Sequence, residues 1–217
     1  MDADVASRTR VRVWDVPVRL VHWLIVALVV TSYVTAKTGH MDYHRYSGYT
    51  MLGLLAFRLY WGFFGSSTAR FAQFLRGPRA MLAYLRGAWP AVVGHNPVGA
   101  LSVLALFLLL VAQVTLGLFA VDIDGIESGP LSNHVSFDAG RRAAEWHEDV
   151  FNTLLVFIAL HVIAIAYYLI VRKDNLVGAM FSGAREMPEG VTPMRPAGWV
   201  RFVIGVLVAG ALVWWIV

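Results

Sequence analysis

Four histidines lie in or beside long apolar stretches of this chain, and they are the residues best suited to chemistry. They are His22, His44, His147 and His161. His147 and His161 are 14 residues apart in one apolar stretch. At about 100° per residue this spacing places both on one face of a helix, roughly 21 Å apart along its axis. Metal–ligand bonds are only about 2 Å long, so the pattern predicts two separate cofactor sites, stacked along the helix.

Each of these two histidines needs a partner at its own depth. His22 is expected near the depth of His161, and His44 near that of His147. Haem suits such pairs, because its iron takes one axial imidazole on each face of an apolar ring. The chain has no cysteine, which rules out covalent attachment through a Cys-containing motif. We therefore predict two non-covalent b haems, and with both axial positions filled the chemistry left is electron transfer.

Two arginines share faces with the proposed ligands. Arg19 is three residues before His22, and Arg58 is 14 residues after His44. A guanidinium is a natural partner for the carboxylates of haem propionates. Both arginines are therefore predicted to bind the propionates of the haem held by His22 and His161. The alternative is that each reaches toward the membrane interface with no cofactor role.

The other histidines are weaker candidates. His40 lies four residues before His44 and rivals it as a ligand, but Gly39 beside it suggests a loop. His95 stands in a Gly-His-Asn-Pro sequence typical of a turn or helix cap. His134 lies in a polar segment. We expect His95 and His134 to be surface or structural residues.

The elements that must position these residues are membrane helices. Hydrophobic residues make up 58% of the chain and charged residues 15%, against about 45–50% and about 25% in soluble domains. This composition argues against a soluble enzyme, a disordered chain or a fibrous protein. Continuous apolar runs favour helices over barrel strands. The predicted spans are residues 20–36, 46–64, 98–121, 144–171 and 199–217.

Basic residues predict the orientation of these spans. With the N-terminus in the cytoplasm, the inner segments carry 13 Lys and Arg residues and the outer segments four, as the positive-inside rule requires. We read the net charge of +4 as loop charge, so no nucleic-acid partner is expected. Residues 68–89 are predicted to form one or two amphipathic helices on the inner interface, broken at Gly77-Pro78; the alternative is a solvated loop.

The stretches around the histidines resemble the prokaryotic cytochrome b561 family. That family is grouped with the b-type cytochrome subunits of nickel–iron hydrogenases and formate dehydrogenases. The resemblance covers about residues 10 to 185. The matching stretches are VWD at 13–15, RLVHW at 19–23, HRYSG at 44–48, RLYWG at 58–62, GHNPVGA at 94–100, WHE at 146–148 and NLVGAMFSG at 175–183.

The resemblance implies an all-α integral membrane protein with a four-helix bundle that holds two haems. The predicted units are residues 1–185 for the haem-binding bundle and residues 186–217 for a linker and a fifth, C-terminal span, which departs from the family core. The implied function is electron transfer between a quinone pool, ubiquinone for example, and a periplasmic or membrane redox partner, in a bacterial inner membrane. No catalytic residue is assigned.

Several other functions stay open at this point. Some members of the family are reported to oxidise superoxide and reduce ubiquinone, and a lip of Arg45, Arg141 and Arg142 would suit that anion. A fifth span is compatible with a subunit of a hydrogenase-type complex. A haem-free transporter would use buried histidines as relays, but would also be expected to carry Asp or Glu in its spans. A non-redox membrane anchor explains the spans but not the paired histidines.

Overall fold

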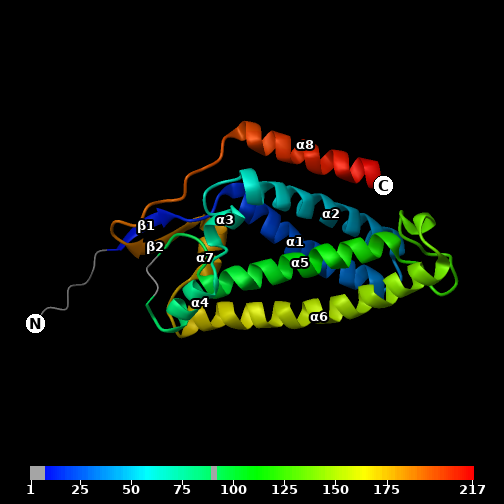
Figure 1. The fold of residues 1–217 in the computed structure, drawn as a ribbon, viewed down its shortest axis with the longest axis horizontal. Helices are drawn as coiled ribbons and strands as arrows, with labels where there is room; N and C mark the ends of the chain where they lie inside the picture. Colours follow the sequence, from blue (N-terminus) through cyan, green and yellow to red (C-terminus); the bar gives the residue numbers. More distant parts are fainter. Residues whose placement is uncertain (1–7, 89–91) are drawn as a thin grey trace, which may run out of the picture.

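The computed structural model of the chain describes residues 8–88 and 92–217. Within these ranges, five long helices run between the two ends of the molecule (Figure 1). They are α1 (Val16–Lys37), α2 (Met41–Phe64), α5 (Pro97–Phe119), α6 (Phe137–Ile170) and α8 (Trp199–Ile216). The short elements are β1 (Arg8–Arg12), α3 (Phe71–Phe74), α4 (Pro78–Leu85), the 3₁₀ helix η1 (Ser132–His134), α7 (Leu176–Ser182) and β2 (Ala184–Pro188).

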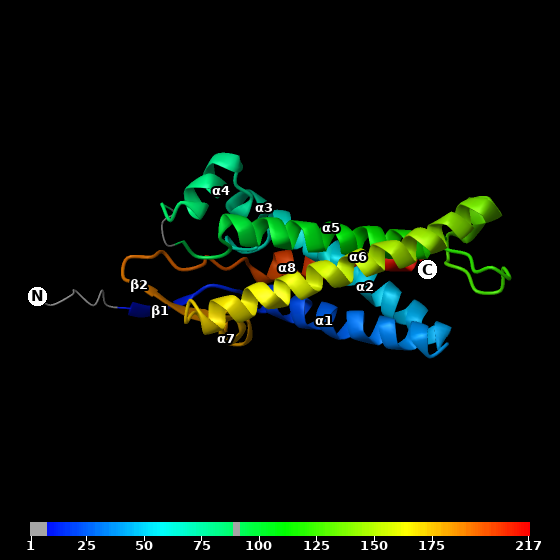
Figure 2. The same cartoon turned by 90° about the horizontal axis from the view of Figure 1, so that it is seen from below.

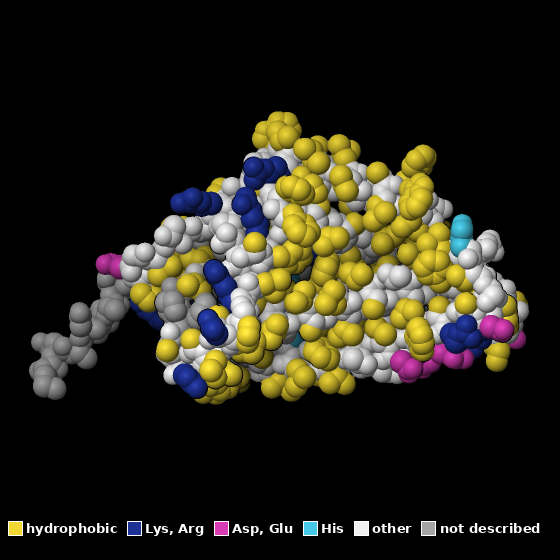
Figure 3. All heavy atoms as spheres, in the orientation of Figure 1, with side chains coloured by type: hydrophobic (Ala, Val, Ile, Leu, Met, Phe, Trp, Pro, Cys, Tyr) yellow, Lys and Arg dark blue, Asp and Glu magenta, His cyan; other side chains and the backbone are white. Residues whose placement is uncertain are grey.

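The two ends of the helix bundle differ in structure and charge. The elements β1, β2, α3, α4 and α7 gather at one end, here called the sheet end, and the α5–α6 loop (residues 120–136) forms the other, the loop end (Figures 1 and 2). In Figure 3 apolar side chains cover the middle of the visible face, most Lys and Arg lie toward the sheet end, and Asp and Glu gather at the loop end. A wide apolar belt between charged ends is expected of a membrane protein.

Four of the five predicted spans correspond to helices that are long and apolar enough to cross a membrane: α1, α5, α6 and α8. Helix α2 has 24 residues but a more polar composition, and it is not among these four, so its crossing of the membrane stays a prediction. Four of the five helices, all but α8, begin earlier than their predicted apolar stretches. Helix α6 starts at Phe137, where the Ser136 hydroxyl accepts a hydrogen bond from the Ala139 amide (3.3 Å).

The long helices pack in pairs, α1 against α2 and α5 against α6, and α8 lies along α2. Small residues allow the close approach of α8. Ala209 is buried, and a Cβ built on Gly205 would lie 2.7 Å from Cδ1 of Tyr60 on α2. The C-terminal helix is therefore a packed part of the bundle.

A small cap closes the sheet end and joins distant parts of the chain. Strand β1 pairs antiparallel with β2, with Arg10 opposite Glu186, and the predicted domain boundary after residue 185 falls inside β2. The amides of Val13 and Trp14 donate to the Gly183 carbonyl (2.8 and 3.1 Å). This two-stranded sheet was not predicted. As predicted, two short helices, α3 and α4, are separated at Gly77-Pro78.

Candidate functional site

Two predicted ligands, His44 and His147, face each other at the loop end. Their ring centroids are 6.0 Å apart and the ring planes cross at 82°. Nδ1 of His44 lies 2.9 Å from the Ser32 carbonyl oxygen, and Nδ1 of His147 lies 2.8 Å from that of Gln113. A carbonyl can only accept, so each Nδ1 donates its hydrogen. In a neutral imidazole the other nitrogen, Nε2, is then free to bind a metal.

Neighbouring helices hold these two rings in place. The carbonyl that orients His44 comes from α1, and the one that orients His147 comes from α5. The hydroxyls of Ser32 and Ser47 are 2.5 Å apart and tie α1 to α2 beside His44. On α5, a Cβ built on Gly117 would lie only 3.0 Å from Cε1 of His147. This contact shows that the ring sits tightly against the α5 backbone.

The other predicted ligands, His22 and His161, lie toward the sheet end. His161 is close enough to His22 for charge on one ring to act on the other. Nδ1 of His22 is buried and has no hydrogen-bond partner within the described ranges. The Nη1 atom of Arg58 is likewise buried and unpartnered in that part of the chain. The orphaned donor of Arg58 is of the kind that a carboxylate of a bound cofactor would satisfy.

An apolar layer separates the two pairs of histidines. Leu154 lies midway between His147 and His161 on α6 and is only 1% exposed. It packs with Met51 and Leu55 of α2 and Leu110 of α5, and α1 side chains complete the cluster. Each site therefore has its own depth in the bundle, as the 14-residue spacing predicts.

The two predicted propionate partners differ in the structure. Arg58 keeps its guanidinium inside the bundle, 5.2 Å from the centroid of the Phe71 ring. Arg19 instead donates to the carbonyl of Phe181 at the end of α7, and its Nε lies 3.4 Å from the Asp15 carbonyl. Arg19 therefore fastens α7 to α1, whereas Arg58 has donors to spare.

The remaining histidines differ in exposure to solvent. His40 and His134 are exposed, whereas the ring of His44 faces that of His147. His95 is not a surface residue. Its ring packs 4.7 Å from Trp14 and 4.9 Å from Phe74, with Nδ1 buried. Burial, with the nearby charges of Arg58 and His161, lowers the pKa of His95 to about 3. The sequence around His95 predicts only a turn. Its burial could not be predicted, because the residues that pack against it are distant in the chain.

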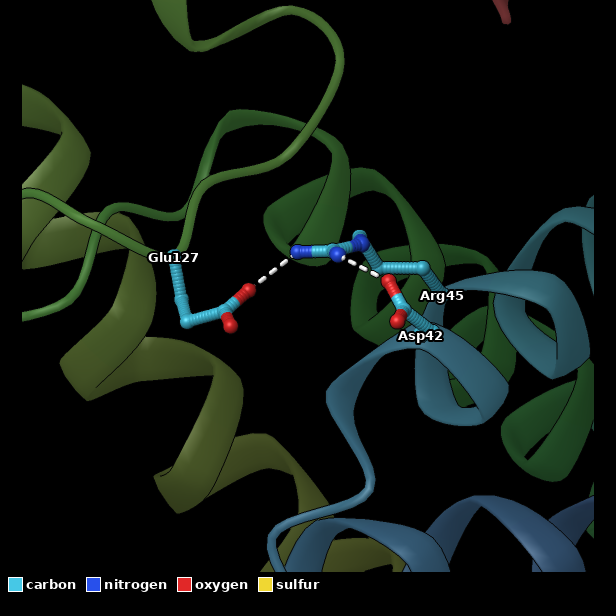
Figure 4. Close-up of polar contacts among 3 residues, drawn as sticks. All are labelled: Asp42, Arg45 and Glu127. Carbon is cyan, nitrogen blue, oxygen red and sulfur yellow. Dashed lines mark hydrogen bonds and ion pairs between the residues drawn. The ribbon is translucent and has the colours of Figure 1, made fainter.

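The predicted cationic lip at the loop end is compensated by carboxylates. Arg45 contacts both Asp42 on its own helix and Glu127 in the α5–α6 loop (Figure 4). Arg141 lies 3.9 Å from Glu145 and donates to the Val121 carbonyl (2.9 Å). These contacts pin the loop beside His44 and neutralise two of the three arginines of the expected lip.

The loop-end pair fits an iron held between two imidazoles. Metal–imidazole bonds are about 2 Å long, and each ring nitrogen lies about 1 Å from its own centroid, so two rings bonded to one ion have centroids about 6 Å apart. The observed separation is 6.0 Å. A Cβ on Gly48, one turn after His44, would meet no atom within 4 Å, which leaves the depth below His44 open to a large flat ring.

Comparison with known proteins identifies the family of this chain. The family model for prokaryotic cytochrome b561 matches residues 13–183. The chain belongs to the prokaryotic cytochrome b561 family. Members of this family are membrane proteins that bind b-type haem and transport electrons.

Several relatives of this cytochrome are named as probable B-type cytochrome subunits of Ni/Fe-hydrogenases. The protein from Azotobacter chroococcum is 27% identical, over 83% of this chain and 90% of the relative. Its counterpart from Azotobacter vinelandii is 26% identical over the same shares. The protein from Escherichia coli is 28% identical over 48% of this chain and 57% of the relative. No protein of known structure gives a significant match.

Proposed function

We propose that this cytochrome b561-family protein holds two b haems and carries electrons across a bacterial inner membrane. His44 and His147 would hold one haem at the loop end, and His22 and His161 the other at the sheet end. The haems, when bound by these histidines, would supply one-electron transfer. The observation that carries the proposal is the facing pair at the loop end, with each Nδ1 bonded to a carbonyl.

The residues around each site have defined roles in this proposal. The Ser32 and Gln113 carbonyls fix the tautomer and angle of the two loop-end rings, which raises ligand basicity. Arg58 would bind a propionate of the sheet-end haem. Arg19 contributes by fixing the cap over that site. Residues 1–185 supply all these groups, and residues 186–217 add the linker and the helix that supports α2.

The donor and acceptor are inferred from chemistry and from the relatives. We propose that electrons pass between a membrane quinone such as ubiquinone and a redox partner protein, of which a hydrogenase is one candidate given the relatives' names. With the N-terminus in the cytoplasm, the loop end faces the periplasm and the sheet end the cytoplasm. Superoxide oxidation is less well supported, because carboxylates offset Arg45 and Arg141, which would attract the anion.

A haem count with ligand variants tests the proposal. The protein is purified in detergent from cells with ample haem, and its reduced-minus-oxidised spectrum and haem content per chain are recorded. We expect a six-coordinate b-type spectrum and two haems. His147→Leu and His161→Leu should each lose one haem, while His134→Leu, an exposed control, should keep both. One haem in the unaltered protein would refute one pair, and no haem would refute the proposal.

A further inference from the structure

A cavity of about 560 Å³ opens at the sheet end, and none of the four proposed haem ligands lines it. Its walls come from the chain after α2, the segment that leads into α5, and the segment between β2 and α8. Three arginines line it, Arg70, Arg76 and Arg195, and no acid is among the lining residues that the structure describes. The cavity therefore concentrates positive charge in a recess.

Hydrogen bonds hold the side chain of one of these arginines and the main chain of another. Nε of Arg70 donates to the Gly65 carbonyl (2.9 Å), which leaves its two terminal nitrogens for other partners. The Ser67 amide donates to the Arg195 carbonyl, and the Arg195 amide donates to the Ser67 hydroxyl, both at 3.0 Å. These reciprocal bonds join the segment before α8 to the opposite wall. The walls of the recess are thus held together by hydrogen bonds of the cap.

Within residues 8–88 and 92–217, no ion pair neutralises the positive charge of the recess. The ion pairs found in the described ranges involve Arg45, Arg141 and Arg185, and none involves an arginine of the cavity. His95 also lines the recess, and its buried Nδ1 has no hydrogen-bond partner in that same part of the chain. Clustered guanidinium groups with free donors favour an oxyanion that accepts several forked hydrogen bonds.

We propose that this cavity binds the phosphate group of an anionic ligand, either a phospholipid headgroup or free phosphate. The surroundings favour the lipid. Helix α4 begins two residues after Arg76 of the recess, and its Leu82 and Leu85 are 48% and 68% exposed, which suits an acyl chain entering the bilayer. Basic pockets at the inner face of membrane proteins bind anionic lipid headgroups in this way. The site lies on the side predicted to face the cytoplasm.

The test uses the full-length, haem-loaded protein in a neutral detergent. Binding of short-chain phosphatidylglycerol, phosphatidylcholine and inorganic phosphate is measured by titration, with the thermal midpoint as a second readout. We expect phosphatidylglycerol to bind and phosphatidylcholine to bind at least tenfold more weakly. If inorganic phosphate binds as tightly as phosphatidylglycerol, free phosphate is the ligand. If neither binds, for example because haem propionates fill the recess, the proposal is wrong.

Matched arginine variants locate the site. Arg70→Gln and Arg76→Gln should each weaken binding roughly tenfold, the effect expected of one charge-assisted contact. Arg79→Gln on α4 removes an exposed arginine outside the cavity and should leave binding unchanged. An unchanged haem spectrum confirms that each variant is folded, and Arg76, which is exposed, can be replaced with little risk to folding. Equal losses in Arg76→Gln and Arg79→Gln would mean nonspecific attraction and would overturn the proposal.

Discussion

Replacing Gly117 by alanine should weaken the loop-end haem site without harming the rest of the bundle. A Cβ at this position would lie 3.0 Å from Cε1 and 3.2 Å from Nδ1 of His147. Unstrained contacts begin at about 3.5 Å, so the ring must retreat by roughly half an ångström. That movement strains the 2.8 Å hydrogen bond from Nδ1 to the Gln113 carbonyl.

The size of the effect follows from the tolerance of metal sites. Productive ligand geometry is held within about 0.5 Å, and loss of an orienting partner typically costs about 10- to 100-fold in metal affinity. The helix itself gains, because alanine is favoured over glycine in a helix by about 1 kcal/mol. Gly117→Ala should therefore keep the fold, retain the sheet-end haem and bind the loop-end haem about 10- to 100-fold more weakly.

The assay is haem titration of the purified apoprotein, followed by its visible spectrum and its thermal midpoint. Gly210→Ala is the matched control, since it also replaces a helical glycine but its Cβ would meet no atom within 4 Å. The control should gain stability and bind both haems normally. If Gly117→Ala binds both haems as tightly as the control, the close contact of the His147 ring with α5 does not affect haem binding, and the prediction is wrong.

Three further predictions concern the cap and the fifth helix. Asp15→Ala removes the cap of α1 and the acceptor of the buried Trp61 indole (2.8 Å), so it should cost about 2–4 kcal/mol, measured as a fall in thermal midpoint; Asp15→Asn should cost less. Gly205→Leu should displace α8 from α2 and lower the midpoint while both haems remain, whereas haem loss would contradict a purely supporting role for α8. The pKa of His95 is about 3 in the folded protein, against a usual value of about 6.5, so its contribution to stability should fall as pH drops from 6.5 toward 3. In thermal melts, His95→Gln should reduce this dependence of the midpoint on pH, and His134→Gln should not.

Spacing within single helices could be predicted from the sequence, because helix geometry fixes it locally. The common face and separate depths of His147 and His161 follow from 14 intervening steps on α6. The ends of the helices were less predictable, because hydropathy identifies only the apolar part of each helix. Helix α6 begins seven residues before its apolar stretch because Ser136 caps a polar first turn. Helix α2 likewise begins at Met41, before the predicted stretch 46–64, because its first turns are polar.

Contacts between distant segments could not be predicted. Strand β1 is rich in arginine, and its partner β2 lies more than 170 residues further along the chain, so neither segment shows a strand pattern of its own. The burial of His95 depends on Trp14 and Phe74, which approach only in the folded cap. The sequence also placed Arg45 in a cationic lip, whereas the fold brings Glu127 to it.

The charged groups beside the two proposed haem sites differ. Near the sheet-end site, Arg58 is a buried cation, and it lies inside the bundle beside Phe71. Near the loop-end site, carboxylates such as Asp42 and Glu127 accompany Arg45. A positive charge stabilises the reduced form of a haem, which carries one more electron, and a negative charge destabilises it. The sheet-end haem is therefore expected to have the higher reduction potential, so that electrons run downhill from the loop end.

Replacing Arg58 should narrow this difference. If removal of its charge costs the reduced state about 1.4 kcal/mol, the potential of the sheet-end haem falls by about 60 mV. Arg58→Gln keeps the length and polarity of the side chain, and an optical redox titration resolves the two haems. The His147→Leu background, with only the sheet-end haem, assigns the shift. A fall confined to the loop-end haem, or no change, would mean that Arg58 does not act on the sheet-end site, and the predicted direction of electron flow would lose its physical basis.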